Sequence, residues 1–142
     1  MAVRSSFLIP QRSRDETALL ISTYQKDHEI LDSVFRERGW TLYSARSTTC
    51  ASAILQQNPG IRVVFTEQDL SGEGWKDVLG LVSGMADPPP LIVVSSVADD
   101  RLWAEALNLG AYDVLAKPFD AEELVRVLQS AWDRGRTGSA AE

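Results

Sequence analysis

The residues of this sequence that are suited to chemistry stand at the ends of its most apolar runs. Glu67 ends the run "VVFTE", and Lys117 follows "DVLA". A carboxylate can act as a nucleophile or a base, and it can pair with an amine. Hydroxyl residues end two further runs: Ser22, Thr23, Ser95 and Ser96. No base stands near Ser22 or Thr23 in the sequence, so we interpret both as loop hydroxyls.

Composition excludes several other classes of site. The single cysteine, Cys50, allows no internal disulfide, and with the single histidine, His28, it leaves no zinc cluster. The net charge of -6 disfavours nucleic acid and anionic membranes as partners. The short apolar run "FLI", stopped by Pro10, is no signal peptide, so a cytoplasmic protein is the default expectation.

Five apolar runs alternate with helical patterns along the chain, and this alternation predicts an α/β fold with a parallel sheet. The predicted strands are "TALLIS", "TLYSA", "IRVVF", "LIVVS" and "DVLA". The second and fifth runs are the most polar and therefore belong at the sheet edges. Right-handed crossovers then favour five strands in the order 2-1-3-4-5, with helices on both faces.

Capping residues and apolar spacing mark the helices. The first helix carries Ile30, Leu31, Val34 and Phe35 on one stripe and ends at Gly39. Three further helices are predicted from about residue 48 to the sequence "NPG", from about 75 to 82, and from 100 to 109. In the last helix, Asp120 and Glu123 form a capping pair.

One domain is predicted, because 142 residues suffice for one good core but not for two. It spans residues 16–133. Residues 1–15 are polar and basic without a period, so we expect a flexible leader, and we expect a flexible tail at 134–142.

The segment "LGAYDVLAKPF", residues 109–119, resembles the Gly-Ala-x-Asp-x-Leu-x-Lys-Pro-Phe signature of response regulator receiver domains. The run "PPLIVVSS" and the five-fold alternation support the resemblance, which covers about residues 16–133 and implies the flavodoxin-like receiver fold. It implies that Lys117 and Ser95 stand where the family contacts a phosphoryl group. It also implies a cis bond before Pro118.

Four positions depart from the family pattern. Ser22 and Thr23 stand where receivers carry an acidic pair that holds Mg²⁺, and Glu67 stands where they carry the phosphate-accepting aspartate. Val114 takes the aromatic switch position. Because Mg²⁺ is held by carboxylates, a pocket with one carboxylate should not bind it, and we expect no metal and no cofactor. Phosphoryl transfer to Glu67 should be negligible, and an exposed Glu67–Lys117 pair should contribute only about 0–1 kcal/mol.

The leading hypothesis is a stand-alone pseudo-receiver, not an enzyme, that acts in two-component signalling through phosphorylation-independent protein contacts. The resemblance implies a kinase, another regulator or an output protein as partner, or self-association. The expected face combines the fourth helix, the fifth strand and the last helix. Its candidate contact residues are Leu102, Trp103, Val114 and Trp132.

Two alternatives remain at this point. In the first, Glu67 or Asp69 accepts a phosphoryl group at an unusual metal site, although we favour Asp69 as a turn residue before "SGEG". In the second, the crevice of a small flavodoxin-like protein holds a cofactor. The sequence offers no phosphate-cradling loop and no set of nucleophile, base and orienting group for that second alternative.

Overall fold

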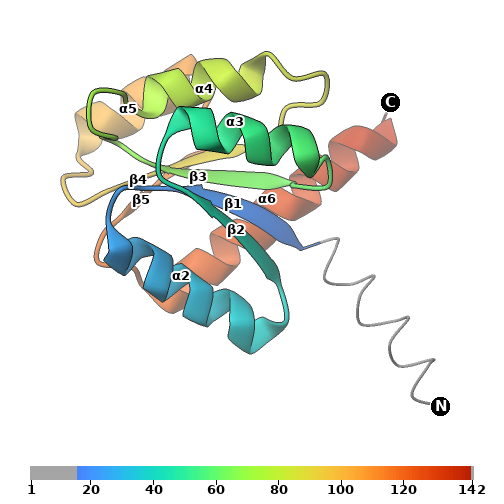
Figure 1. Ribbon diagram of the computed structural model, residues 1–142, viewed down its shortest axis with the longest axis horizontal. Coiled ribbons are helices and arrows are strands. Elements are labelled where there is room, and N and C mark those ends of the chain that lie inside the picture. Colours follow the sequence, from blue (N-terminus) through green and yellow to red (C-terminus); the bar gives the residue numbers. More distant parts are fainter. Residues whose placement is uncertain (1–15, 142) are drawn as a thin grey trace.

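The computed structural model describes residues 16–141, with side chains described for residues 16–134, so the leader expected at 1–15 lies outside the described residues. Five strands alternate with five helices along this part of the chain (Figure 1). The strands are β1 (Thr17–Ile21), β2 (Thr41–Ala45), β3 (Val63–Glu67), β4 (Leu91–Ser95) and β5 (Asp113–Ala116). The helices are α2 (Gln25–Arg38), α3 (Thr48–Gln57), α4 (Trp75–Ser83), α5 (Asp100–Leu109) and α6 (Ala121–Ala141).

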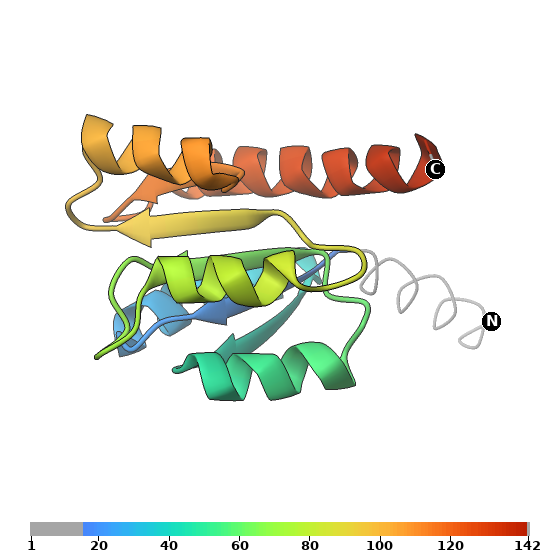
Figure 2. The ribbon, with the colours of Figure 1, turned by 90° about the horizontal axis from the view of Figure 1, so that it is seen from above.

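The strands form one parallel sheet in the order β2-β1-β3-β4-β5, as predicted from the sequence. Helices α2 and α6 cover one face of the sheet, and α3, α4 and α5 cover the other (Figures 1 and 2). The chain adds β2 on one side of β1 and then adds β3, β4 and β5 on the other side, so the strand order switches between β1 and β3. In open parallel sheets, ligand-binding groups collect at the carboxyl ends of the strands beside such a point.

Burial along the strands follows the predicted order. Every residue of β1, β3 and β4 is buried, whereas β2 and β5 expose residues to solvent at the two edges. Under α2 and α6 the core contains three aromatic rings in edge-to-face contact: Phe35, Trp40 and Trp132. Each large apolar side chain buried in this way contributes about 1.5–3 kcal/mol. The sheet is therefore a rigid base for groups at its carboxyl edge.

Helix ends lie close to where the sequence predicts them. Gly39 and Gly110 end α2 and α5 in the left-handed conformation, with φ of 73° and 118°, which glycine adopts without strain. At the start of α6, Asp120 Oδ1 accepts the backbone N–H groups of Glu122 and Glu123. Asp120 thus supplies its half of the predicted capping pair.

The C-terminal boundary differs from the prediction. Helix α6 continues to Ala141, through most of the segment 134–142 that was expected to be a flexible tail. The glycines at 135 and 138 disfavour a helix interior by only about 1 kcal/mol each, which is too weak to end a helix anchored by a packed first half. Within the described residues, no helix has both the length and the apolar character that a bilayer crossing requires.

Candidate functional site

The carboxyl ends of β3 and β5 bring Glu67 and Lys117 together. Lys117 Nζ lies 2.5 Å from Glu67 Oε1, and the two side chains are only 12% and 6% exposed. The exposed ion pair expected from the sequence is therefore wrong, because both side chains point into the edge of the sheet. At this depth the attraction between opposite charges is stronger than at the surface.

A second carboxylate, Asp27, reaches the same amine from the first turn of α2. Lys117 Nζ lies 2.9 Å from Asp27 Oδ2, and the Asp27 side chain is 5% exposed. The expectation of a single carboxylate is thus wrong as well. Helical spacing carried the missing signal, since Asp27 stands four residues before Leu31 and seven before Val34, on the buried stripe of α2.

Ser22 has a larger part in the site than the sequence suggested. Its side chain is fully buried, and its Oγ donates a hydrogen bond to Asp27 Oδ2 at 2.7 Å while accepting the N–H of Tyr24. Ser22 therefore orients the carboxylate that holds Lys117. Thr23 is half-buried, and its backbone carbonyl accepts a hydrogen bond from Arg46.

Both oxygens of the Glu67 carboxylate are engaged. Oε1 pairs with Lys117, and Oε2 accepts the backbone N–H of Asp69 at 3.1 Å. Asp69 turns its backbone toward the site, and an isolated bridge to Gly74 closes the turn that follows β3. Since Asp69 is exposed, its geometry is that of the turn residue named among the alternatives.

Ser95 and Pro118 occupy the ends of β4 and β5. Ser95 is 1% exposed, and its hydroxyl donates to Gln68 Oε1 at 2.6 Å while it accepts the N–H of Val97. It is thus turned toward the β3 loop. The peptide bond between Lys117 and Pro118 is cis, as the resemblance implied.

Two side chains of the β1–α2 segment surround this cluster. The Tyr24 ring, 54% exposed, covers the amine with its centroid 4.4 Å from Lys117 Nζ, which adds a cation–π contact. On the inner side, His28 Nε2 donates to the Ser22 carbonyl at 2.8 Å and fixes the turn that positions Ser22. A backbone carbonyl can only accept, so Nε2 carries a proton.

The electrostatics of the cluster favour a charged lysine. Burial lowers the pKa of Lys117, but hydrogen bonds and charges from Asp27 and Glu67 outweigh burial and raise that pKa above its ordinary 10.5. One amine between two carboxylates leaves a net charge near -1. We refer to Asp27, Glu67 and Lys117 as the ion triad.

These residues do not fit the Mg²⁺ site that the resemblance would imply. Mg²⁺ needs oxygen ligands in near-ideal octahedral geometry, usually including carboxylates. The resemblance aligns Ser22 and Thr23 with the acidic pair, and Lys117 occupies one oxygen of each nearby carboxylate. Among the described residues, no three His, Cys, Asp or Glu side chains are grouped to hold a metal ion.

The structure separates the four residues expected at an interface. Trp103 is 51% exposed on α5, and Val114 on β5 is nearly buried below it. Leu102 and Trp132 are 5% and 1% exposed, and Trp132 Nε1 donates to the Thr17 carbonyl under the opposite face of the sheet. The expectation that Leu102 and Trp132 contact a partner is therefore wrong, because both pack in the core.

Comparison with known proteins agrees with this architecture. A family model described as "Response regulator receiver domain" matches residues 19–129. The sensory transduction protein LytT of Bacillus subtilis is 28% identical over 117 residues, which cover 82% of this chain and 42% of LytT. The transcriptional regulatory protein FixJ of Bradyrhizobium diazoefficiens is 30% identical over 83 residues, which cover 57% of this chain and 40% of FixJ. The chain thus spans less than half the length of these curated relatives.

Solved structures show the same fold. The signal receiver domain of a putative Luxo repressor protein from Vibrio parahaemolyticus matches with a TM-score of 0.80 at 16% identity, covering 89% of this chain and 97% of that one. A chain in the crystal structure of the CheX–CheY–BeF3–Mg complex from Borrelia burgdorferi matches with a TM-score of 0.74 at 17% identity, covering 82% of this chain and 88% of that one.

Proposed function

Because this chain belongs to the response regulator receiver domain family, we propose that it is a signalling domain that acts through protein contacts without accepting a phosphoryl group. Receiver domains work in two-component signalling by contacting kinases, other regulators or output domains. The residues at the carboxyl edge of the sheet do not support regulation by phosphorylation of an aspartate.

The ion triad is the observation that carries the proposal. Lys117 binds Asp27 and Glu67 at once, so the chain itself supplies the cation between its buried carboxylates. Both oxygens of Glu67 already have partners. A phosphoryl donor would have to displace one of these contacts before Glu67 could attack it.

The chemistry of phosphoryl transfer points the same way. A carboxylate attacks phosphorus in line, and metal ions neutralise the charge that develops on the phosphoryl oxygens. Glu67 is one methylene longer than aspartate, and a displacement of about 1 Å costs roughly a hundredfold in rate. The net negative charge of the triad also repels a phosphoryl dianion.

The output of such a domain is a surface. The face that joins α5, β5 and α6 is the proposed contact region, and it carries the half-exposed Trp103. One matched structure, the CheX–CheY complex, is a precedent for a receiver-like chain bound to a separate protein. Family membership also favours this function over the flavodoxin-like cofactor binder.

Intact mass measurement tests the proposal. The protein is incubated with acetyl phosphate and Mg²⁺ beside a receiver domain that carries a complete acidic pair. We expect a phosphoryl adduct on the control domain only. An adduct on this chain that maps to Glu67 or Asp69 would overturn the proposal and establish the phosphorylatable alternative.

A further inference from the structure

A hollow of about 430 Å³ lies on the proposed contact face, between the start of α5, the strand β5 and the start of α6. Its size is that of a site for one large side chain or a small ligand. The lining residues are Ala98, Asp99, Asp100, Trp103, Val114, Ala116 and Glu123.

The apolar part of the hollow centres on Trp103. This ring is 51% exposed, whereas Trp75 and Trp132 are 5% and 1% exposed. The nearly buried Val114 and the small side chain of Ala116 belong to the same lining. A half-exposed indole beside small apolar groups offers contact area, and aromatic residues are enriched at the centres of protein interfaces.

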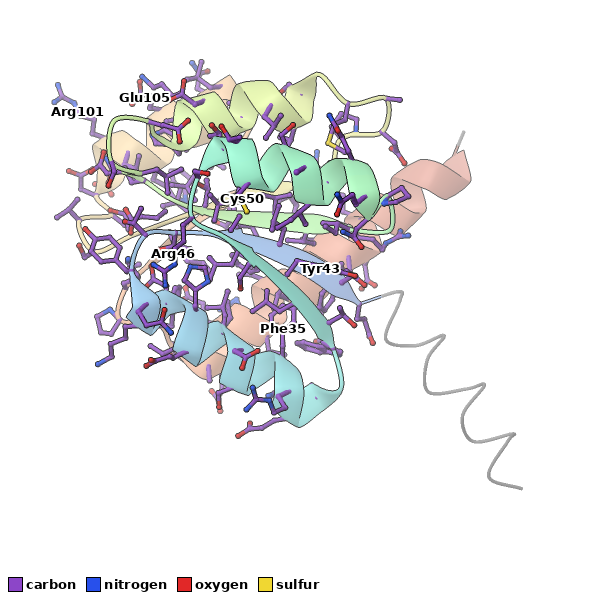
Figure 3. All side chains as sticks on the ribbon, viewed as in Figure 1. Phe35, Tyr43, Arg46, Cys50, Arg101 and Glu105 are labelled. Atoms are coloured by element: carbon purple, nitrogen blue, oxygen red, sulfur yellow. The ribbon has the colours of Figure 1, made fainter. Side chains whose placement is uncertain are left out.

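The charged part of the hollow is entirely acidic. Asp99 Oδ1 caps α5 by accepting the N–H of Leu102, whereas Asp100 and Glu123 make no ion pair with any residue whose side chain is described. Two cations of α4 and α5 do not pair with these carboxylates. Lys76 pairs with Glu105, and Arg101 extends from α5 into solvent (Figure 3).

Resting on the proposed function, we propose that this hollow binds an arginine side chain of a partner protein. A guanidinium is planar and always charged, so it stacks on an indole face and pairs with carboxylates in one pose. Trp103 provides the ring, while Asp100 and Glu123 provide the carboxylates. A second copy of this chain is disfavoured as the occupant, because each copy carries a net charge of -6.

Nuclear magnetic resonance of the full chain tests the inference with a defined probe, the capped peptide acetyl-Leu-Arg-Leu-Arg-amide. Its matched control carries citrulline, which keeps the shape of arginine without the charge. The indole N–H signal of Trp103 is assigned by its loss in Trp103→Phe. We expect this signal to shift with the arginine peptide and to stay in place with the citrulline peptide.

A charge-matched pair of variants makes the test specific. Asp100→Asn/Glu123→Gln should weaken binding at least about fivefold, since two partly exposed ion pairs are lost. Glu29→Gln/Glu37→Gln, which removes two exposed charges from α2, outside the lining of the hollow, should bind as the parent does. The three-way comparison separates a local pair from general attraction to an acidic protein.

Several results would overturn the inference: no shift of the Trp103 signal at saturating peptide, equal binding of the citrulline peptide, or equal loss in both double variants. A Trp103 signal that shifts with protein concentration as the chain dimerises would mean that a second copy of the chain, and not an arginine of a partner, occupies the hollow. A phosphoryl adduct on Glu67 would contradict the proposed function but not the arginine site. Failure of the peptide to bind, with no phosphoryl adduct, would contradict only the arginine site.

Discussion

The ion triad and the hollow beside Trp103 adjoin each other at the end of β5. Their charged side chains differ in burial and in pairing. Ala116 lines the hollow, and the next residue, Lys117, turns into the triad. In the triad the charges are buried and paired within the chain. In the hollow the carboxylates of Asp100 and Glu123 make no ion pair with any described side chain, and Asp100 is exposed while Glu123 is half-buried. This contrast indicates that the triad serves the domain itself and that the hollow is available to another molecule.

The largest effect should come from removing the shared cation. Lys117→Met leaves the buried carboxylates of Asp27 and Glu67 without a cation, so the free energy of unfolding should fall by about 3–5 kcal/mol in urea denaturation. The control is Lys76→Met, which breaks the exposed pair with Glu105 and should change stability by only about 0–1 kcal/mol. Equal losses in the two variants would mean that the triad is no more than surface charge.

The two tryptophans on α5 and α6 extend the comparison to packing. Trp132→Ala removes a ring buried against Phe35 and Trp40, and should cost about 3–5 kcal/mol of unfolding free energy. Trp103→Ala should cost under about 1 kcal/mol, because Trp103 is already half-exposed to water. Thermal and urea unfolding of both variants give the values. A large loss in Trp103→Ala would make Trp103 a structural residue and remove it from the contact face.

A smaller effect separates the two carboxylates of the triad. Asp27→Asn keeps the size of the side chain but removes its charge from Lys117 and Ser22, and should cost about 1–3 kcal/mol. Asp32→Asn, on the exposed side of the same helix beside Arg36, is the matched control and should stay within about 0.5 kcal/mol. If both substitutions were equally mild, Glu67 alone would hold Lys117.

The difference between these regions also explains what the sequence could and could not predict. Strand order was predictable because strands buried on both faces, here β1, β3 and β4, have continuous apolar sequences. The signature around Lys117 and Pro118 predicted their place and the cis bond. The pairing of Lys117 with Asp27 was not predictable, since 90 residues separate them and an acidic residue in the first turn of a helix is common.

Burial of the interface candidates follows from helical spacing and not from side-chain type. Leu102, Trp103 and Trp132 all lie on amphipathic helices, and side-chain type alone does not say which stripe faces the sheet. Trp132 continues the stripe of Leu124, Val127 and Leu128, and this spacing placed it in the core. Trp103 stands beside the buried Leu102, one helical position away, and therefore points outward.

The mildest perturbation of the triad is pH. The pKa of Lys117 is raised in the folded protein, so its contribution to stability is complete below pH 10.5 and is lost as the pH rises through the higher folded value. The unfolding temperature should therefore fall more steeply above about pH 10.5 than the other lysines and tyrosines alone would cause.

In Lys117→Arg the side chain keeps its charge at high pH, so this extra fall should be absent. Thermal scans of both proteins between about pH 9 and pH 11.5 measure the difference, which cancels every group they share. Parallel profiles would show that Asp27 and Glu67 do not hold the Lys117 proton, and the two regions at the end of β5 would then no longer differ in how they treat charge.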